Sequence, residues 1–309
     1  MTRLEMPVLL RELEPTAAAN LDRHLRVAKE WMPHDYVPWG QGRDFDPERG
    51  GVAWEPGQST LSAVAQTAFE VNLLTEDNLP SYHRELVDGF GRDGAWGTWV
   101  GRWTAEEGRH SLAMRDYLLC TRGVDPVALE RGRMQQVQVG YDAVDKDALR
   151  VLAYVSLQEL ATRISHRNTG RFTEDALADR LLARIASDEN LHMVFYRDLV
   201  TSALELNASQ TVEAIAAEVL GFAMPGTGIV DFEAKALEIA KAGIYDLRVH
   251  HDEVVLPLLR HWGFWDLTGL DAAAETARGQ VQDFLTGLDA LACRYEQRRA
   301  EREQRALAA

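Results

Sequence analysis

Two short segments of the chain place a glutamate three residues before a histidine. They are Glu107–His110, within TAEEGRH, and Glu189–His192, within DENLH. Residues three apart lie on the same side of a helix, so each segment can present a carboxylate and an imidazole together. Apolar residues continue the same helical stripe, such as Trp103 and Met114 around the first segment and Ile185 before the second. One such pair could be a buried histidine satisfied by a carboxylate, so the surrounding pattern must decide.

Two lone glutamates, Glu76 and Glu159, lie on apolar stripes of the same kind. A single buried glutamate is rare and costly unless it is paired or binds a metal. Glu76 precedes Glu107 by 31 residues, and Glu159 precedes Glu189 by 30 residues. A chain that ascends one helix and returns along its antiparallel neighbour brings residues at this spacing to one level. An acid also precedes each motif glutamate, Glu106 in the first half and Asp188 in the second.

This internal near-repeat predicts a carboxylate-bridged centre for two metal ions, with one glutamate from each of two helices and a Glu-x-x-His pair from each of two others. The predicted ligands are Glu76, Glu107, His110, Glu159, Glu189 and His192. A set rich in oxygen and free of thiolates favours iron or manganese over zinc. Without metal, four clustered carboxylates must bind protons or repel one another, so we expect the apo-protein to melt below the metal-bound form.

The periodicity of the chain predicts helices almost throughout and no strand pattern, as in an all-α, ferritin-like four-helix bundle with additional helices. We expect one di-iron domain over residues 1–309, consisting of an N-terminal helix and Trp-rich loop (1–58), a metal-binding bundle (59–204) and additional helices (205–309). Pro80 deprives the carbonyl of Glu76 of its helical partner, and either kinks one helix or starts a second. The expected helices are 16–31, 59–90, 94–121, 125–140, 146–170, 173–204, 208–222, 231–245, 247–262 and 272–305, with a break at 224–228.

The composition excludes several classes of protein. A net charge of −15 argues against nucleic acid or an anionic membrane as the main partner. No apolar run approaches the length of a membrane span, and the N-terminus lacks the pattern of a secretion signal. The two cysteines, Cys120 and Cys293, cannot form a disulfide framework, which favours a cytoplasmic protein.

At these residues the sequence resembles the soluble acyl-[acyl-carrier-protein] desaturases, in particular their actinobacterial branch. The resemblance extends from about residue 13 to residue 245. The segments that carry it are KEWMPHDYVPWG (29–40), LLTEDNLPSYHREL (73–86), RWTAEEGRH (102–110), SLQELATRISHRNTG (156–170) and IASDENLHMVFYRD (185–198).

The resemblance implies roles for individual residues. Glu76 and His110 would bind one iron, Glu159 and His192 the other, and Glu107 and Glu189 would bridge the two.

Three further residues would act beside these ligands. Thr162 would lie on the oxygen side of the site, and Trp31, Asp188 and His110 would form a route for electrons. The near-repeat suggests that Glu106 is the counterpart of Asp188 and supports His192. One departure is Leu160, since plant members usually carry arginine immediately after this lone glutamate.

The implied reaction is oxygen-dependent desaturation of an acyl chain on acyl carrier protein, with a cis double bond as product, in fatty acid biosynthesis. The resemblance also implies a ferredoxin-type electron donor and a homodimer. Both partner proteins are acidic, so this acidic chain needs a local basic surface. Arg23, Arg26 and Lys29 form one candidate, and Arg298, Arg299, Arg302 and Arg305 form another. A di-iron hydroxylase of a carrier-bound natural-product intermediate and an iron-storage protein remain as alternatives.

Overall fold

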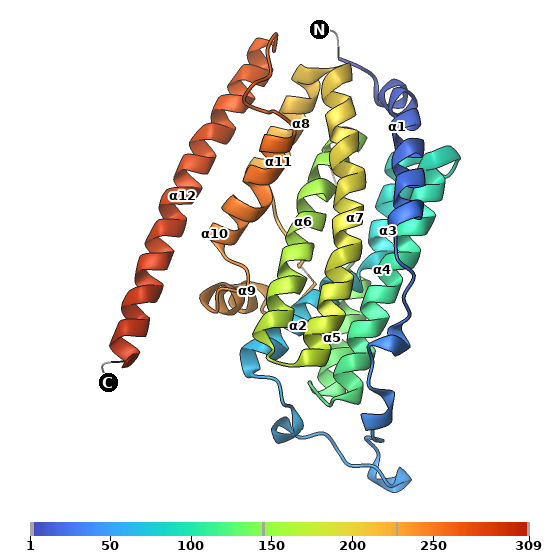
Figure 1. Cartoon of the computed structure of the whole chain (residues 1–309), viewed down its shortest axis with the longest axis vertical. Helices are drawn as coiled ribbons and strands as arrows, with labels where there is room; N and C mark the ends of the chain where they lie inside the picture. The colour runs from blue at the N-terminus through green and yellow to red at the C-terminus, as the bar shows by residue number, and fades with distance from the viewer. Residues whose placement is uncertain (1–2, 144–145, 227, 308–309) are drawn as a thin grey trace.

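The computed structural model describes residues 3–143, 146–226 and 228–307, and these ranges are helical without a strand (Figure 1). This confirms the all-α prediction. Residue 227, within the predicted break at 224–228, lies outside the described residues, as do the extreme termini of the predicted domain. The helices are α1 (Met6–Val27), α2 (Ala63–Glu76), α3 (Leu79–Phe90), α4 (Gly94–Cys120), α5 (Pro126–Val139), α6 (Ala148–Phe172), α7 (Ala176–Leu206), α8 (Ala208–Leu220), α9 (Phe232–Lys241), α10 (Leu247–Val249), α11 (Leu256–His261) and α12 (Ala272–Leu307).

Four helices, α2, α4, α6 and α7, surround a common interior, because α2 contacts α4 and α6, and α7 contacts the same two. Capping side chains start three of them: Ser62 accepts from the backbone of α2, Asp147 from that of α6, and Asp175 from that of α7. These caps satisfy N–H groups that have no partner within the helix. The arrangement is a ferritin-like four-helix bundle.

The sequence prediction was wrong about both ends of the first helix. α1 begins at Met6 rather than at residue 16, and it ends at Val27, before Trp31. Pro15 lies inside the helix, where the carbonyl of Arg11 loses its partner, but both residues are exposed and water can replace that bond. Leu13 is fully buried and anchors this early part of the helix against the bundle.

The segment from 32 to 58 is a loop with four short 3₁₀ turns, Pro33–Asp35, Trp39–Gln41, Pro47–Arg49 and Pro56–Gln58. Three of its four aromatic residues contact other side chains or backbone: Tyr36 lies edge-on to Trp31, Phe45 lies beneath the guanidinium of Arg122, and Trp54 donates a hydrogen bond to the carbonyl of Arg122. The fourth, Trp39, is 52% exposed.

The predicted helix over 59–90 is two helices, and Pro80 stands in the first turn of the second, α3. The chain therefore breaks directly after Glu76, which is the last residue of α2. Of the two readings of Pro80, the start of a new helix is the one observed.

The remaining helices, α8 to α12, cover one side of the bundle, and α12 runs along its edge (Figure 1). A π-helical turn, His250–Val255, joins α10 to α11. One cluster of buried apolar side chains includes residues of α1, α4, α7, α8 and α12. On this continuity we propose that the chain folds as one domain. No described helix is long and apolar enough to cross a membrane.

Candidate metal centre

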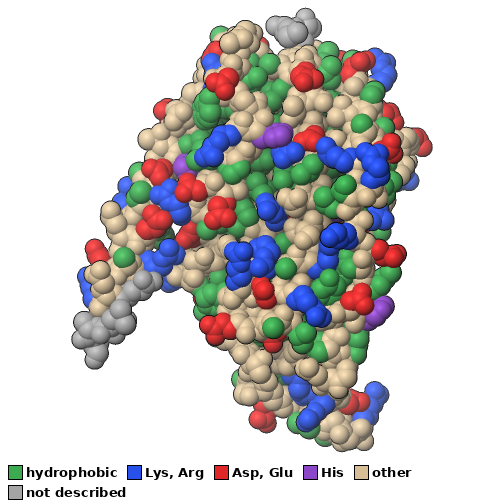
Figure 2. Space-filling view, in the orientation of Figure 1, with side chains coloured by type: hydrophobic (Ala, Val, Ile, Leu, Met, Phe, Trp, Pro, Cys, Tyr) green, Lys and Arg blue, Asp and Glu red, His purple; other side chains and the backbone are tan. Residues whose placement is uncertain are grey.

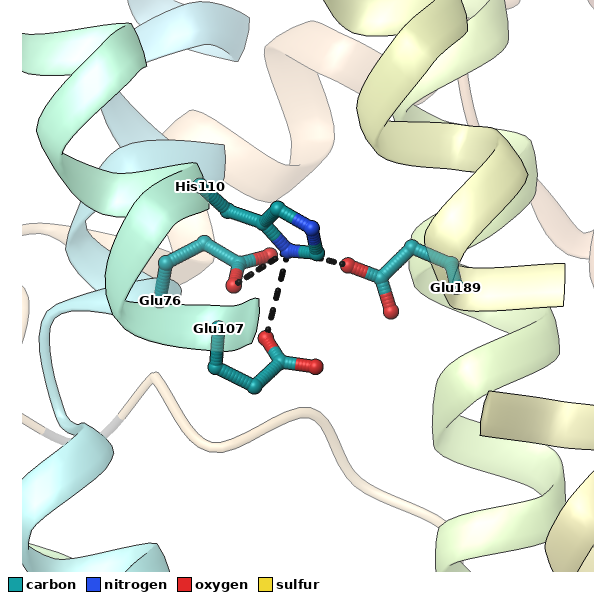
Figure 3. A group of neighbouring side chains, drawn as sticks. All are labelled: Glu76, Glu107, His110 and Glu189. Atoms are coloured by element: carbon teal, nitrogen blue, oxygen red, sulfur yellow. Dashed lines mark ion pairs between the residues drawn. The ribbon is translucent and has the colours of Figure 1, made fainter. Parts of the chain in front are cut away.

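The structure brings all six predicted ligand side chains together in the interior of the bundle. α2 supplies Glu76, α4 supplies Glu107 and His110, α6 supplies Glu159, and α7 supplies the Glu189–His192 pair. Each of the six is buried, with no more than 6% of its surface exposed. Figure 3 shows three of the glutamates, from α2, α4 and α7, around the imidazole of His110.

The donor atoms fall into two overlapping groups of four, and within each group they all lie within 4.8 Å of one another. Glu107 and Glu189 belong to both groups. The first group adds Glu76 and His110, and the second adds Glu159 and His192.

Each imidazole directs its Nδ1 atom at the glutamates. His110 Nδ1 lies 3.2 Å from Glu189 Oε1 and 3.5 Å from Glu107 Oε2. His192 Nδ1 lies 2.8 Å from Glu107 Oε1 and 3.5 Å from Glu159 Oε2. The two shared carboxylates therefore stand between the two histidines.

The pKa values of the candidate carboxylates are shifted in opposite directions by their surroundings. Burial, followed by repulsion from Glu189 and Glu76, raises the pKa of Glu107 to about 8. Burial and repulsion from Glu189 also raise the pKa of Glu159 well above its usual value. Burial, followed by repulsion from Glu189, would raise the pKa of Glu76, but the nearby imidazoles of His110 and His166 outweigh both effects and lower that pKa to about 2. Such opposed shifts are typical of charges that need a cationic partner.

Several atoms that face one another at this centre have no hydrogen-bond partner among the described residues. They are Glu107 Oε1, His110 Nδ1, Glu159 Oε2, Glu189 Oε1 and His192 Nδ1. Unpaired buried polar atoms are costly, and converging lone pairs of this kind are what a metal ion satisfies. The donor set of four carboxylates and two imidazoles fits two iron or manganese ions.

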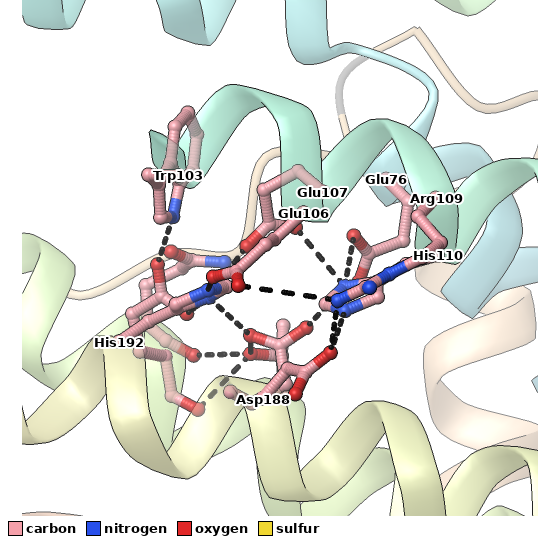
Figure 4. Close-up of polar contacts among 12 residues, drawn as sticks. Glu76, Trp103, Glu106, Glu107, Arg109, His110, Asp188 and His192 are labelled. Carbon is pink, nitrogen blue, oxygen red and sulfur yellow. Dashed lines mark hydrogen bonds and ion pairs between the residues drawn. The ribbon is translucent and has the colours of Figure 1, made fainter. Parts of the chain in front are cut away.

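Asp188 holds the first histidine from behind (Figure 4). Its Oδ2 atom lies 3.3 Å from His110 Nε2 and accepts hydrogen bonds of 2.7 Å from Trp31 Nε1 and 2.9 Å from an Arg109 nitrogen. Arg184 pairs with its other oxygen. An N–H at Nε2 leaves the Nδ1 lone pair of His110 free to face the glutamates. The predicted Trp31–Asp188–His110 series is therefore continuous in space.

Glu106 holds the second histidine in the same manner. Its Oε2 atom lies 3.0 Å from His192 Nε2 and 2.9 Å from His24 Nε2, and Arg102 pairs with its other oxygen. His24 is buried in α1 and was not recognised from the sequence. The two halves of the centre thus have matching outer carboxylates, one bonded to tryptophan and the other to histidine.

Two more side chains that contact the ligands were not recognised as part of the site. Trp103 Nε1 donates a hydrogen bond of 2.9 Å to Glu159 Oε1, and His166 Nε2 lies 2.9 Å from Glu76 Oε1. A signal was present in both cases, because Trp103 is one turn before Glu107 and His166 is two turns after Glu159 on the same stripes.

Thr162 lies one turn after Glu159, and its hydroxyl is 3.4 Å from Glu189 Oε2. Two largely apolar cavities flank this part of α6. One is lined by α2, α6 and α9, including Thr162. The lining of the other includes Trp103 and Gln158. Leu160, the departure noted in the sequence, is buried in the core instead of facing the ligands.

The chain matches the family model described as fatty acid desaturase over residues 5–308. It is 46% identical over 308 residues to the putative acyl-[acyl-carrier-protein] desaturase DesA1 of Mycobacterium tuberculosis, an alignment that covers 96% of this chain and 91% of that protein.

Two further relatives extend the comparison. The chloroplastic stearoyl-[acyl-carrier-protein] 9-desaturase of Gossypium hirsutum is 31% identical over 321 residues, with 96% of this chain and 78% of that protein covered. The X-ray structure of the putative acyl-ACP desaturase DesA2 from Mycobacterium tuberculosis H37Rv superposes with a TM-score of 0.69 at 33% identity, and covers 87% of this chain and 99% of that one.

Proposed function

Because the chain belongs to the fatty acid desaturase family, we propose that it is an acyl-[acyl-carrier-protein] desaturase, which forms a cis double bond in an acyl chain on acyl carrier protein. The observation that carries this proposal is the pair of overlapping ligand groups that share Glu107 and Glu189. The names of the relatives support the substrate class.

We assign Glu76 and His110 to one iron ion, and Glu159 and His192 to the other. The shared Glu107 and Glu189 would bridge them, as their membership of both groups suggests. A bound pair of iron ions would supply the O₂-dependent oxidation of an unactivated C–H bond, which side-chain acid–base chemistry cannot perform. In the balanced reaction, two hydrogens leave adjacent methylenes, and O₂ takes up two further electrons and two protons to give two waters.

The two apolar cavities are suited to hold the acyl chain beside this centre. Both follow one face of α6, where Val155 lines one and Ala161 the other. An extended chain that occupied both would place a pair of methylenes next to Glu159 and Thr162. Apolar walls stabilise the hydrocarbon by burial and exclude water from the reacting carbons.

The chain of Trp31, Asp188 and His110 is our candidate route for electrons from a ferredoxin-type donor. Hydrogen bonds and short contacts join the three side chains without a gap. The ring of Trp31 also lies parallel to that of His110, with centroids 6.2 Å apart. Thr162 is proposed to orient groups on the side of the centre that faces the cavities.

Mass spectrometry of the acyl product tests the proposal. The iron-loaded protein is supplied with a saturated acyl carrier protein, O₂ and a reductant, and the product is cleaved and analysed. We expect a loss of two mass units, with the double bond located by chemical derivatisation. A gain of sixteen mass units would instead identify a hydroxylase, and an unchanged chain would contradict both activities.

A further inference from the structure

A groove lies between α9, α10 and the C-terminal half of α12. Its walls carry five basic side chains: Lys241, Arg248, Arg298, Arg299 and Arg302. Figure 2 shows lysine and arginine side chains interspersed with acidic ones along α12 and the adjoining face of the bundle. The five basic side chains outnumber the two acidic residues of the groove, Asp246 and Glu296, in a chain whose net charge is −15.

Some of these charges are already neutralised and others are not. Arg248 pairs with Asp289 at 2.7 Å, and Arg299 pairs with Asp246 at 3.1 Å. Lys241, Arg298 and Arg302 are exposed and form no ion pair among the described residues. The groove therefore keeps positive charge that an acidic partner could neutralise.

The groove also adjoins the cavity beside Thr162. α9 separates the two spaces, since Ala236 and Ile239 line the cavity while Lys241 lines the groove. In the turn after α9, Tyr245 faces the cavity and the next residue, Asp246, faces the groove. A group held in the groove therefore needs to pass only α9 or this turn to reach the cavity.

Given the proposed function, we propose that the α9–α12 groove is the docking surface for the acidic acyl carrier protein. The carrier lies against Lys241, Arg298 and Arg302. Its prosthetic arm crosses the turn after α9 and delivers the acyl chain into the cavity beside Thr162.

The ferredoxin-type electron donor is also acidic and could compete with the carrier for a basic surface. The fold provides a separate side of the bundle for each of these two partners. α1, the helix that precedes Trp31, lies on the side of the bundle opposite α12 (Figure 1). Arg23, in the other basic candidate surface on α1, is already paired with Asp198 at 2.6 Å. The Trp31 side is thus suited to the donor, and the α9–α12 side is left to the carrier.

A second arginine-rich hollow, between α6, α7 and α11, is a weaker candidate for the carrier. Arg167 pairs with Asp179 and Arg197 with Asp198, so part of its charge is already neutralised. Its lining includes Leu160 and Met193, which are buried.

Charge reversal tests the docking surface. The iron-loaded Lys241→Glu/Arg298→Glu/Arg302→Glu variant is compared with an Arg43→Glu/Arg92→Glu/Arg131→Glu control, in which three exposed arginines elsewhere give the same change in net charge. We expect the Kd for acyl carrier protein to rise about tenfold or more at low salt in the first variant, and less than threefold in the control. The difference should shrink at high salt, and kcat at saturating carrier should stay within about twofold of wild type.

Three results would overturn the docking surface: equal weakening in both triple variants, an unchanged Kd in the groove variant, or a loss confined to reduction by the donor. A charge-conserving Lys241→Arg/Arg298→Lys/Arg302→Lys variant should bind like wild type, and single reversals replace the triple if it fails to fold. Failure of the proposed function is distinguishable, because the wild-type protein would then neither bind nor convert the acyl carrier protein.

Discussion

Trp31 and His110 contact the same oxygen atom, Asp188 Oδ2, at 2.7 Å and 3.3 Å. The indole comes from the segment after α1 and the imidazole from α4, so a single carboxylate of α7 couples the loop region to the metal centre. Trp31 is only 4% exposed, and the guanidinium of Arg109 lies 4.4 Å from the centre of its ring.

Replacing Trp31 by phenylalanine should slow electron delivery while leaving metal binding intact. The ring volume is largely kept, but the hydrogen bond to Asp188 and the easily oxidised indole are lost. We expect the stopped-flow rate of reduction by a ferredoxin-type donor to fall about tenfold or more, a factor that corresponds to roughly 1.4 kcal/mol in activation free energy. The Trp39→Phe variant is the control, because Trp39 is exposed and lies in the same loop. Equal rates for Trp31→Phe and wild type would exclude this route.

His24 should influence the iron position that contains His192. Its hydrogen bond orients Glu106, which in turn orients the imidazole of His192. Loss of an outer partner of this kind typically weakens metal binding by about 10–100-fold. We expect the His24→Phe variant to lose affinity at one of two metal sites in a chelator competition, and the His24→Gln variant to recover much of it. Identical two-site affinities for all three proteins would contradict the role of His24.

Removal of metal should lower thermal stability because the buried carboxylates then repel one another. Metal at about a hundred times its Kd stabilises the folded state by about 2.7 kcal/mol. We therefore expect the Tm of the chelated protein to lie several degrees below that of the iron-loaded protein. The Glu107→Gln variant replaces this carboxyl group, whose pKa is raised to about 8, by a neutral amide of nearly the same volume. Its apo form should melt no lower than the wild-type apo form, and iron should shift its Tm little. A large iron-dependent shift in this variant would show that Glu107 is not a ligand.

We expect folding stability to fall in acid because of His250, which lies away from the metal centre. Burial, followed by the nearby charge of His251, lowers the pKa of His250 from 6.5 to about 4. Between these values the unfolded chain binds a proton that the folded protein does not, so stability decreases as the pH falls from about 6.5 to 4. This difference between the pKa values of His250 in the unfolded and folded protein corresponds to about 3 kcal/mol of folding free energy.

The His250→Gln variant isolates this effect. Glutamine can still accept a hydrogen bond from Tyr245, whose hydroxyl lies 3.0 Å from His250 Nδ1. In urea denaturation, the stability advantage of wild type over the variant should shrink by up to about 3 kcal/mol between pH 7 and pH 4. A difference independent of pH would show that His250 titrates normally.

The convergence of the six candidate ligands was predictable because it depends only on helical periodicity and on two near-equal spacings of about 30 residues. The partners from distant segments were not. His24 is 82 positions from Glu106, and no periodic pattern relates them. Its helix was also misplaced, since it was expected over residues 16–31 and is observed over Met6–Val27.

The cavities and the α9–α12 groove depend on how separate helices pack, so their outlines could not be read from the sequence. Sequence composition did identify Arg298 and Arg302 as part of a basic stretch. It could not show that they face Lys241 of α9 across a groove. The ferredoxin-type donor, the homodimer and the cytoplasmic location stay predictions.

The most direct measurement is anomalous diffraction at the iron edge from crystals grown with ferrous iron. The account predicts two iron peaks in each chain, both contacted by Glu107 and Glu189. One should also be bound by Glu76 and His110, and the other by Glu159 and His192. An interior without iron peaks, or iron bound at residues other than these six, would contradict the account.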